Sequence, residues 1–208
     1  MRIGFMGGTF SPPHKGHLHS AKVFAEEMKL DKLLIIPAKV SPFKVNDTPT
    51  ASDEDRFEMT SLCFGKLSEQ GFNVEISDIE ISKNSASYTI ETICELKKLY
   101  PEDELYMFVG SDMFQSLERW KNSDKIFENC RIYTRCRQQN ELETMLATKE
   151  KYEKNFGATV FLSNDKEIVV SSTDVRNALQ TKNFETCQNL LTDEVFRYII
   201  KGGLYFGE

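Results

Sequence analysis

The sequence has no long apolar segment, no paired cysteines and few histidines, and each absence excludes a class of protein. No apolar run approaches the roughly 20 residues of a membrane-spanning helix, and the opening residues read as a strand rather than a signal peptide. Five cysteines, without a Cys-x-x-Cys pair, indicate reduced thiols rather than a disulfide framework. The net charge of −6 argues against a nucleic-acid partner. We therefore expect a cytoplasmic protein that binds neither membrane nor nucleic acid.

The remaining composition is that of an ordinary globular protein. Of the 208 residues, 40% are hydrophobic and 28% are charged, which is enough to bury the core of one domain. No repeat, low-complexity tract or linker divides the chain. We expect a single domain over residues 1–208, in which residues from about 182 to 208 form a small C-terminal helical lobe. A homo-oligomer is compatible with this composition, and the sequence does not fix the number of copies.

Hydrophobic periodicity predicts strands and helices that alternate along the whole chain. The expected strands cover residues 1–6, 32–36, 74–81 with a break near Asp78, 104–109, 131–134, 158–162 and 167–170. The expected helices begin at Gly16, Asp53 (with Ser52 as its N-cap), Thr89, Gln138, Ser171 and Phe184. The last stretch comprises one or two helices that end near Lys201. This alternation predicts an α/β fold with a doubly wound, mostly parallel, Rossmann-like sheet and short C-terminal helices.

All three histidines of the chain lie close together, and two of them belong to the histidine turn, residues 7–17 (GGTFSPPHKGH). Gly7 and Gly8 let the backbone approach a ligand, and the first amides of the following helix favour an anion. His14 and His17 can donate hydrogen bonds to phosphate oxygens. The turn therefore predicts a phosphate site. The alternatives are a Gly/Pro turn with solvated histidines, or a metal site, which lacks the cysteine or carboxylate ligands of a zinc centre.

A second stretch with the same chemistry lies near the other end of the chain, at residues 170–176 (VSSTDVR). Ser171, Ser172 and Thr173 supply hydroxyls beside free amides, and Arg176 carries a guanidinium suited to phosphate oxygens. The alternative is a well-capped surface helix. Two phosphate-binding turns at the carboxyl edge of one sheet predict a site for a polyphosphate nucleotide, namely ATP.

Both turns resemble signatures of the nucleotidylyltransferase superfamily. Residues 9–17 are similar to its prolyl turn followed by His-x-Gly-His, and residues 170–176 resemble its I-S-S-T-x-x-R motif. Residues 87–89 (SYT), 110–112 (GSD) and Trp120 are similar to segments of the bacterial nicotinate-nucleotide adenylyltransferases. Taken alone, the first of these reads as an N-cap with a core tyrosine, and a single tryptophan is more often part of a core.

The resemblance implies transfer of the adenylyl group of ATP to nicotinate mononucleotide, with Mg²⁺ carried by the nucleotide phosphates and no metal site of the protein. The catalytic residues it implies are His14, His17, Lys44 and Arg176. The ATP-binding residues it implies are Gly7, Gly8, Thr9, Phe10, His14, His17, Gly110, Asp112, Ser171, Ser172, Thr173 and Arg176. The acceptor-binding residues it implies are Thr9, Lys44, Ser87, Tyr88, Thr89, Asp112 and Trp120.

The sequence departs from the family pattern at the mouth of the site. Ser11 stands where aspartate is usual and Phe43 where histidine is usual, so a contact made by that histidine cannot be carried over. Two alternatives remain open. One is an adenylyltransferase with another acceptor, nicotinamide mononucleotide or phosphopantetheine. The other is a nucleotide-binding module without turnover, and pyrophosphate release from ATP distinguishes the two.

Overall fold

The computed structural model describes residues 1–39, 51–83, 88–136, 141–165, 168 and 170–206. Its strands are β1 (Arg2–Gly8), β2 (Lys32–Pro37), β3 (Val74–Ile76), β4 (Glu104–Val109), β5 (Arg131–Arg135) and β6 (Val160–Ser163). Its helices are α1 (Lys15–Glu27), α2 (Asp53–Glu69), α3 (Thr89–Leu99), α4 (Ser111–Phe114), α5 (Ser123–Asn129), α6 (Leu142–Phe156), α7 (Ser172–Gln180), α8 (Phe184–Leu190) and α9 (Asp193–Gly202), with the short 3-10 helix η1 (Leu117–Arg119).

The strands form one sheet in the order β3-β2-β1-β4-β5-β6, and all neighbours run parallel. The chain builds outward from β1 in one direction and then, starting with β4, in the other. β1 and β4 therefore flank the topological switch point, where ligands of open α/β sheets bind. The predicted doubly wound fold is confirmed, and the sheet is parallel throughout the described residues.

Alternate residues of each central strand enter two separate hydrophobic cores. In β2, Leu33 and Ile35 join a core with α1 and α2, whereas Leu34 and Ile36 join a core with α3, α5 and α6. Both faces of the sheet are thus covered, which explains why these strands read as continuous apolar runs. The helices hold the carboxyl ends of the strands in place, and the loops that follow β1 and β4 open at that edge.

Some sequence predictions of element boundaries are wrong. The strand expected over residues 74–81 ends at Ile76, because the N–H and hydroxyl of Ser82 both bond to the carbonyl of Asp78 and close a turn. Ile79 and Ile81 are covered within that turn, so their apolar character reflects packing rather than strand pairing. The first helix begins at Lys15 instead of Gly16. The start predicted for the later helix, Gln138, lies outside the described residues, and within them α6 covers Leu142–Phe156.

The strand expected at residues 167–170 is also wrong for the residues described there. Neither Ile168 nor Val170 belongs to a strand; Ile168 is exposed, while Val170 packs against the core formed by α1 and α2. Residues 167 and 169 lie outside the described part. The short apolar run that suggested a strand thus contains side chains with different surroundings. The helix expected after them, α7, does begin at Ser172.

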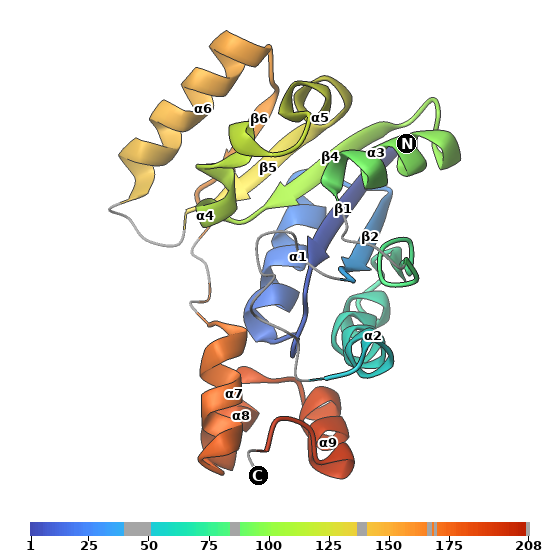
Figure 1. Ribbon diagram of the computed structural model, residues 1–208, viewed down its shortest axis with the longest axis vertical. Helices are drawn as coiled ribbons and strands as arrows, with labels where there is room; N and C mark the ends of the chain where they lie inside the picture. Colours follow the sequence, from blue (N-terminus) through green and yellow to red (C-terminus); the bar gives the residue numbers. More distant parts are fainter. Residues whose placement is uncertain (40–50, 84–87, 137–140, 166–167, 169, 207–208) are drawn as a thin grey trace.

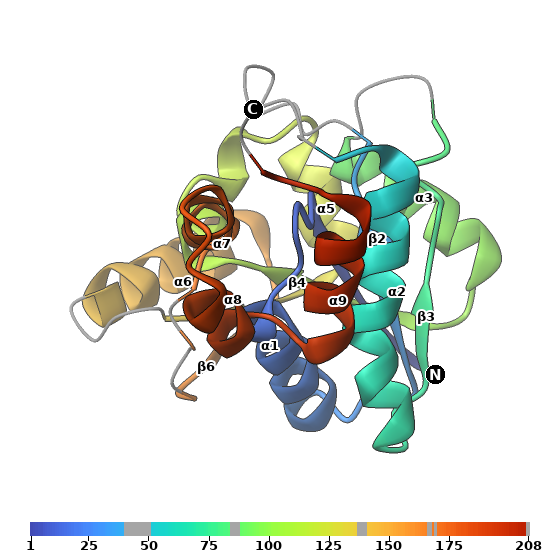
Figure 2. The same cartoon turned by 90° about the horizontal axis from the view of Figure 1, so that it is seen from below.

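The C-terminal helices lie beyond the carboxyl end of the sheet. Figure 1 shows α7, α8 and α9 gathered at the end of the molecule toward which the arrows of β1 and β2 point. Seen from below, α9 runs beside α2 (Figure 2). Val195 and Ile199 of α9 are fully buried in the core that also contains Met59 and Cys63 of α2. The C-terminal helices therefore share the core of the sheet.

Candidate active site

The histidine turn connects β1 to α1 and is closed by its own imidazoles. His14 is the N-cap of α1, and its Nδ1 accepts a hydrogen bond from the N–H of His17 at 3.3 Å. The Nδ1 of His17 in turn accepts from the N–H of His14, also at 3.3 Å. The two rings stack with their centroids 3.6 Å apart. The pair forms a capping box made of histidines and satisfies amides that a helix start otherwise leaves unpaired.

These backbone contacts fix which nitrogen of each ring carries the proton. A ring nitrogen that accepts a hydrogen bond has no proton, so each neutral imidazole carries its proton on Nε2. His14 and His17 therefore both present an Nε2–H donor, the kind of group that suits a phosphate oxygen. His19 differs, since its Nε2 lies 2.9 Å from Oδ2 of Asp165. The structure thus brings together two of the three histidines in the way the sequence suggested.

Phe10 supports the turn from inside the protein. It is 2% exposed, has a φ of +47°, and packs its ring edge-on against His17 and Phe64. A Cβ on Gly8 would lie 2.9 Å from the Phe10 ring, so Gly8 makes room for this side chain. In the structure, the buried side chain of Phe10, a predicted ATP-binding residue, packs against the ring of His17.

Arg56 of α2 is a functional candidate that the sequence reasoning missed. It is fully buried and donates to the carbonyls of Thr9 at 2.8 Å and Ala38 at 2.7 Å. A further nitrogen contacts the carbonyl of Lys39 and the carboxylate of Asp53. Arg56 thereby joins the histidine turn to the segment that follows β2. A signal existed, since Arg56 shares the helical spacing of the buried residues Met59, Cys63 and Phe64.

The ion pairs around Asp53 predict a pH dependence of stability. Partial burial raises the pKa of Asp53, but hydrogen bonds from Lys39 and Arg56 outweigh it and hold the pKa below its ordinary value. The folded state is therefore favoured above the unfolded-state pKa of about 4, and this contribution is lost as the pH falls through the folded pKa. We expect acid to destabilise Asp53→Asn less than wild type, as measured by urea unfolding between about pH 3 and 7. Parallel pH profiles of the two proteins would contradict this assignment.

The second turn predicted to bind phosphate is the N-terminus of α7. Ser171 is its N-cap, and its hydroxyl oxygen accepts from the N–H of Asp174 at 3.1 Å. The Asp174 carboxylate accepts in return from the N–H and hydroxyl of Ser171, and these hydrogen bonds lower the pKa of Asp174. The well-capped helix that was the structural alternative is thus present. This cap does not exclude a binding role for the turn, because Ser172 and Arg176 also contact the histidine turn.

Those contacts join the two turns directly. The Ser172 hydroxyl donates to the carbonyl of Pro12 at 2.9 Å. The Arg176 guanidinium donates to the carbonyl of Ser11 at 2.8 Å and to the hydroxyl of Thr173 at 3.1 Å. Two segments about 160 residues apart are therefore in hydrogen-bond contact beyond the end of β1. The predicted proximity of the two turns is found, although it does not depend on a strand before α7.

Gly110 and Asp112 follow β4, the strand next to β1 at the switch point. Gly110 is the N-cap of α4, and Asp112 lies exposed in the first turn of that helix. Its Oδ1 accepts a hydrogen bond from the N–H of Met113 at 2.9 Å. The register pairs Met6 of β1 with Phe108 of β4, so the two strands end close to each other. A carboxylate is thus available on the β4 side of the same sheet edge.

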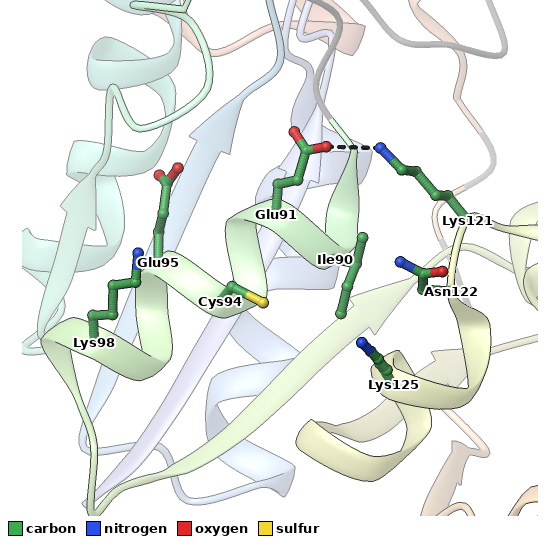
Figure 3. Close-up of a pocket in the computed structure, with 8 residues that line it drawn as sticks. All are labelled: Ile90, Glu91, Cys94, Glu95, Lys98, Lys121, Asn122 and Lys125. Carbon is green, nitrogen blue, oxygen red and sulfur yellow. Dashed lines mark hydrogen bonds and ion pairs between the residues drawn. The ribbon is translucent and has the colours of Figure 1, made fainter.

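The two segments expected to bind the acceptor are joined by Lys121. Tyr88 is the N-cap of α3 and is 36% exposed, so it is not the core tyrosine of the structural alternative. The Lys121 ammonium lies 4.0 Å from the centre of the Tyr88 ring and 2.9 Å from Oε1 of Glu91. Figure 3 shows Lys121 reaching across to α3 to make this ion pair. Its neighbour Trp120 is half-buried against the core beneath α3 and α5.

Some predicted site residues lie outside the part of the chain that the structure describes, and other expectations concern membrane helices, metal sites and disulfides. Lys44, Phe43 and Ser87 belong to segments that the structure does not describe. Within the described residues, no helix is long and apolar enough to cross a membrane. In the same part of the chain, no group of three His, Cys, Asp or Glu side chains is arranged to hold a metal ion. All five cysteines are free, as expected from the sequence.

The shape of the chain is similar to that of solved enzymes. The Plasmodium falciparum nicotinic acid mononucleotide adenylyltransferase complexed with NaAD matches it with a TM-score of 0.78 at 18% identity, covering 98% of this chain and 97% of that chain. The same enzyme complexed with APC matches with a TM-score of 0.76 at 18% identity, covering 98% and 96%. At this identity the likeness establishes the fold.

Sequence relatives identify the family. The Cytidylyltransferase-like family model matches residues 5–178, from β1 into α7, and so includes both turns predicted to bind phosphate. The probable nicotinate-nucleotide adenylyltransferase of Dictyoglomus thermophilum is 34% identical over 205 residues, covering 99% of this chain and 100% of the relative. That of Clostridium tetani is 33% identical over 199 residues, covering 96% of each. Since these relatives match essentially end to end, the chain belongs to the nicotinate-nucleotide adenylyltransferase family.

Proposed function

We propose that this protein transfers the adenylyl group of ATP to nicotinate mononucleotide, giving nicotinate adenine dinucleotide and pyrophosphate. The observation that supports this most is the hydrogen-bonded junction of the two turns, Ser172 to Pro12 and Arg176 to Ser11, at the switch point of the sheet. These contacts support the proposal because they join two turns whose groups suit anions, in a member of this family. A polyphosphate chain fits such a site better than a single phosphate does.

In the proposed reaction, a 5′-phosphate oxygen of nicotinate mononucleotide attacks the α-phosphorus of ATP in line. The bond from that phosphorus to the oxygen bridging to the β-phosphorus breaks, and pyrophosphate leaves with the bonding electron pair. The attacking phosphate is already an anion, so the protein need not supply a nucleophile or a strong base. Catalysis then depends on holding the reactants in line and on stabilising charge at the phosphoryl oxygens.

Each turn has its own role in this proposal. The Nε2–H groups of His14 and His17 donate to α- and β-phosphate oxygens as negative charge develops there. Arg176, with the hydroxyls and amides at the start of α7, holds the leaving pyrophosphate. Gly7, Gly8, Thr9 and the backbone of Phe10 line the path of the nucleotide. We assign to Lys44 the steering of the acceptor phosphate.

The acceptor and the ribose are assigned to the β4 side of the site. Asp112 and Gly110 suit the ribose hydroxyls, since an exposed carboxylate accepts hydrogen bonds from them. Thr89 opens α3, and the amides of a helix start favour a carboxylate, which fits nicotinate better than nicotinamide. Ser87 and Tyr88 complete this segment, and Trp120 offers an aromatic surface for the pyridine ring.

The cation expected for this reaction is Mg²⁺, entering with ATP. Most groups in the two turns are imidazole and guanidinium donors, hydroxyls and amides, which suit the phosphates rather than a cation. The one carboxylate of the two turns, that of Asp174, accepts hydrogen bonds from the N–H and hydroxyl of Ser171. Mg²⁺ bound to the phosphates would neutralise part of their charge. The protein's own residues would then bind the complex of the nucleotide with the ion.

The decisive experiment is pyrophosphate release from ATP and Mg²⁺ with three acceptors offered separately: nicotinate mononucleotide, nicotinamide mononucleotide and phosphopantetheine. We expect rapid release with nicotinate mononucleotide and far slower release with the other two. Preference for another acceptor would overturn the assignment of Thr89 and Trp120 while keeping the ATP site. Binding of ATP without release from any acceptor would favour a nucleotide-binding module.

Lys121 provides a test of the acceptor site that leaves the ATP site untouched. Replacing it by methionine removes the charge that joins Tyr88 to Glu91, so the two acceptor segments lose a contact worth about 0.5–1 kcal/mol. We expect Lys121→Met to raise the KM for nicotinate mononucleotide about threefold without changing the KM for ATP. Steady-state kinetics with each substrate varied in turn measures both constants.

Lys125→Met is the matched control for this variant. Lys121 and Lys125 both line a pocket of about 360 Å³ between α3 and α5. In Figure 3 no dashed line joins Lys125 to the other residues drawn. We expect Lys125→Met to keep both KM values. If the two variants behaved alike, the contact of Lys121 with Tyr88 and Glu91 would have no part in holding the acceptor.

A further inference from the structure

The residue that replaces the usual aspartate of the histidine turn has an unexpected partner at the far end of the chain. The Ser11 hydroxyl lies 3.1 Å from the Tyr205 hydroxyl, and the two residues are 3% and 6% exposed. This hydrogen bond joins positions 194 residues apart. It adds to the bonds that Arg176 and Ser172 make to the carbonyls of Ser11 and Pro12. Residues 11 and 12 are thus held from three points of the C-terminal part of the chain.

The backbone on both sides of this hydrogen bond is in an unfavourable conformation. Phe10, immediately before Ser11, has a φ of +47°, and Tyr205 has a φ of +66°. Large side chains seldom adopt this left-handed region, and where they do, the surrounding contacts hold them there. Phe10 is held by its packing against His17 and Phe64. The strained residue next to Ser11 is therefore the one that positions a catalytic histidine.

The segment that carries Tyr205 is itself firmly anchored. Helix α9 ends at Gly202 and is capped by Gly203, which has a φ of +63°. The N–H of Leu204 donates back to the carbonyl of Ile199 at 3.1 Å. On α9, the Tyr198 hydroxyl donates to Asp55 of α2 at 2.9 Å, and Glu194 pairs with Lys66 of α2 at 2.7 Å. Both views show α9 beside α2 (Figures 1 and 2). Tyr205 is thus presented to the turn by a fixed element.

The histidine turn is consequently held on two sides by one pair of helices. Arg56 of α2 binds the carbonyl of Thr9, and Tyr205, just after α9, binds the side chain of Ser11. Phe10 lies between these two points. If the C-terminal segment moved, Ser11 and its neighbour Phe10 would move with it, and the packing of Phe10 against the ring of His17 would change. Burial also raises the pKa of Tyr205 to about 12, so its hydroxyl keeps its proton at any ordinary pH.

We propose that Tyr205 is a positioning residue for adenylyl transfer, which holds Ser11 and thereby sets the geometry of His14 and His17. This inference rests on the proposed function, and it makes the C-terminal segment part of the active-site scaffold rather than a separate lobe. The chain from Met1 to Tyr205 then acts as one functional domain.

The test compares Tyr205→Phe with Tyr198→Phe. Each variant loses one tyrosine hydroxyl from the same region, but only Tyr205 contacts the turn. We expect Tyr205→Phe to lower kcat about 10-fold or more with similar KM values, because small displacements of catalytic groups are costly. Tyr198→Phe should keep kcat, because the Glu194–Lys66 ion pair and the buried Val195 and Ile199 still hold α9 against α2. The two variants should lose comparable thermal stability. Ser11→Ala should reproduce the loss, and the double variant Ser11→Ala/Tyr205→Phe should be no slower than either single variant.

A readout without substrate separates this inference from the proposed function. The chain has only three histidines, so the imidazole nitrogen resonances of all three can be assigned by nuclear magnetic resonance. Tyr205→Phe should shift those of His14 and His17 and leave that of His19, which pairs with Asp165. If neither the resonances nor kcat differed from those of Tyr198→Phe, the inference would be wrong. A wild-type protein without turnover would instead refute the proposed function, and the resonances would still decide the role of Tyr205.

Discussion

His17→Ala is expected to slow pyrophosphate release by about 10²–10³-fold, because the variant lacks an Nε2–H donor aimed at developing phosphoryl charge. The same substitution removes the Nδ1 that accepts from the N–H of His14, so α1 loses half of its capping box. A lost cap costs about 1 kcal/mol of the free energy of unfolding. Initial rates with ATP, Mg²⁺ and nicotinate mononucleotide measure the first effect, and urea unfolding measures the second.

The third histidine of the chain supplies the matched control for this variant. His19 lies on the same helix and is also partly exposed, but it bonds to Asp165 outside the turn. We expect His19→Ala to keep wild-type turnover. A difference in rate between the two variants then reflects the position of His17 rather than the loss of any histidine. Wild-type turnover of His17→Ala would disprove the role proposed for the imidazole pair.

Arg56→Met is expected to lower the free energy of unfolding by about 3 kcal/mol, the largest stability effect that we foresee for a single side chain. The guanidinium is fully buried and serves the carbonyls of Thr9, Ala38 and Lys39 as well as the Asp53 carboxylate. Methionine fills much of the space but donates no hydrogen bond, so these carbonyls lose their partner in a dry environment. Urea unfolding at neutral pH measures the loss.

Arg197, an arginine with an exposed side chain, is the control for the buried Arg56. Its side chain is 75% exposed and lies 4.0 Å from Asp193, an ion pair of the kind that contributes little. We expect Arg197→Met to change the free energy of unfolding by less than about 0.5 kcal/mol. Equal losses in the two variants would mean that burial of Arg56 does not hold the histidine turn. Turnover of Arg56→Met should also fall under conditions in which it remains folded, because Thr9 belongs to the turn.

Part of the site can be predicted from residues that are close together in the sequence. The histidine turn was predicted from a strand, a Gly/Pro turn and a helix start, all of which are encoded within a dozen neighbouring residues. The reciprocal cap of His14 and His17 has the same local origin, since it joins residues three apart. The prediction nonetheless treated the amides at the start of α1 as open to an anion. In the structure, that of His17 is already bonded to His14.

Contacts between distant segments were beyond such reasoning. Nothing near Arg56 in the sequence indicates that its guanidinium binds Thr9, and nothing near Tyr205 indicates Ser11. The strand expected at residues 167–170 was wrong for the same reason, because the surroundings of Ile168 and Val170 are set by other elements. The pattern of apolar residues indicates which side chains tend to be buried, but the element against which each one packs depends on the whole fold.

The sequence by itself determined the α/β alternation, the parallel sheet and the two turns for which we predict phosphate binding, because periodicity, turn residues and helix caps are local properties. Tertiary structure decided how those turns are held: by a buried arginine on α2, by Ser172 and Arg176 of α7, and by a tyrosine after α9. The physical reason is that a hydrogen bond between distant segments depends on the whole chain being packed. Such a bond contributes to the free energy of folding once packing has brought its partners together and removed water from them.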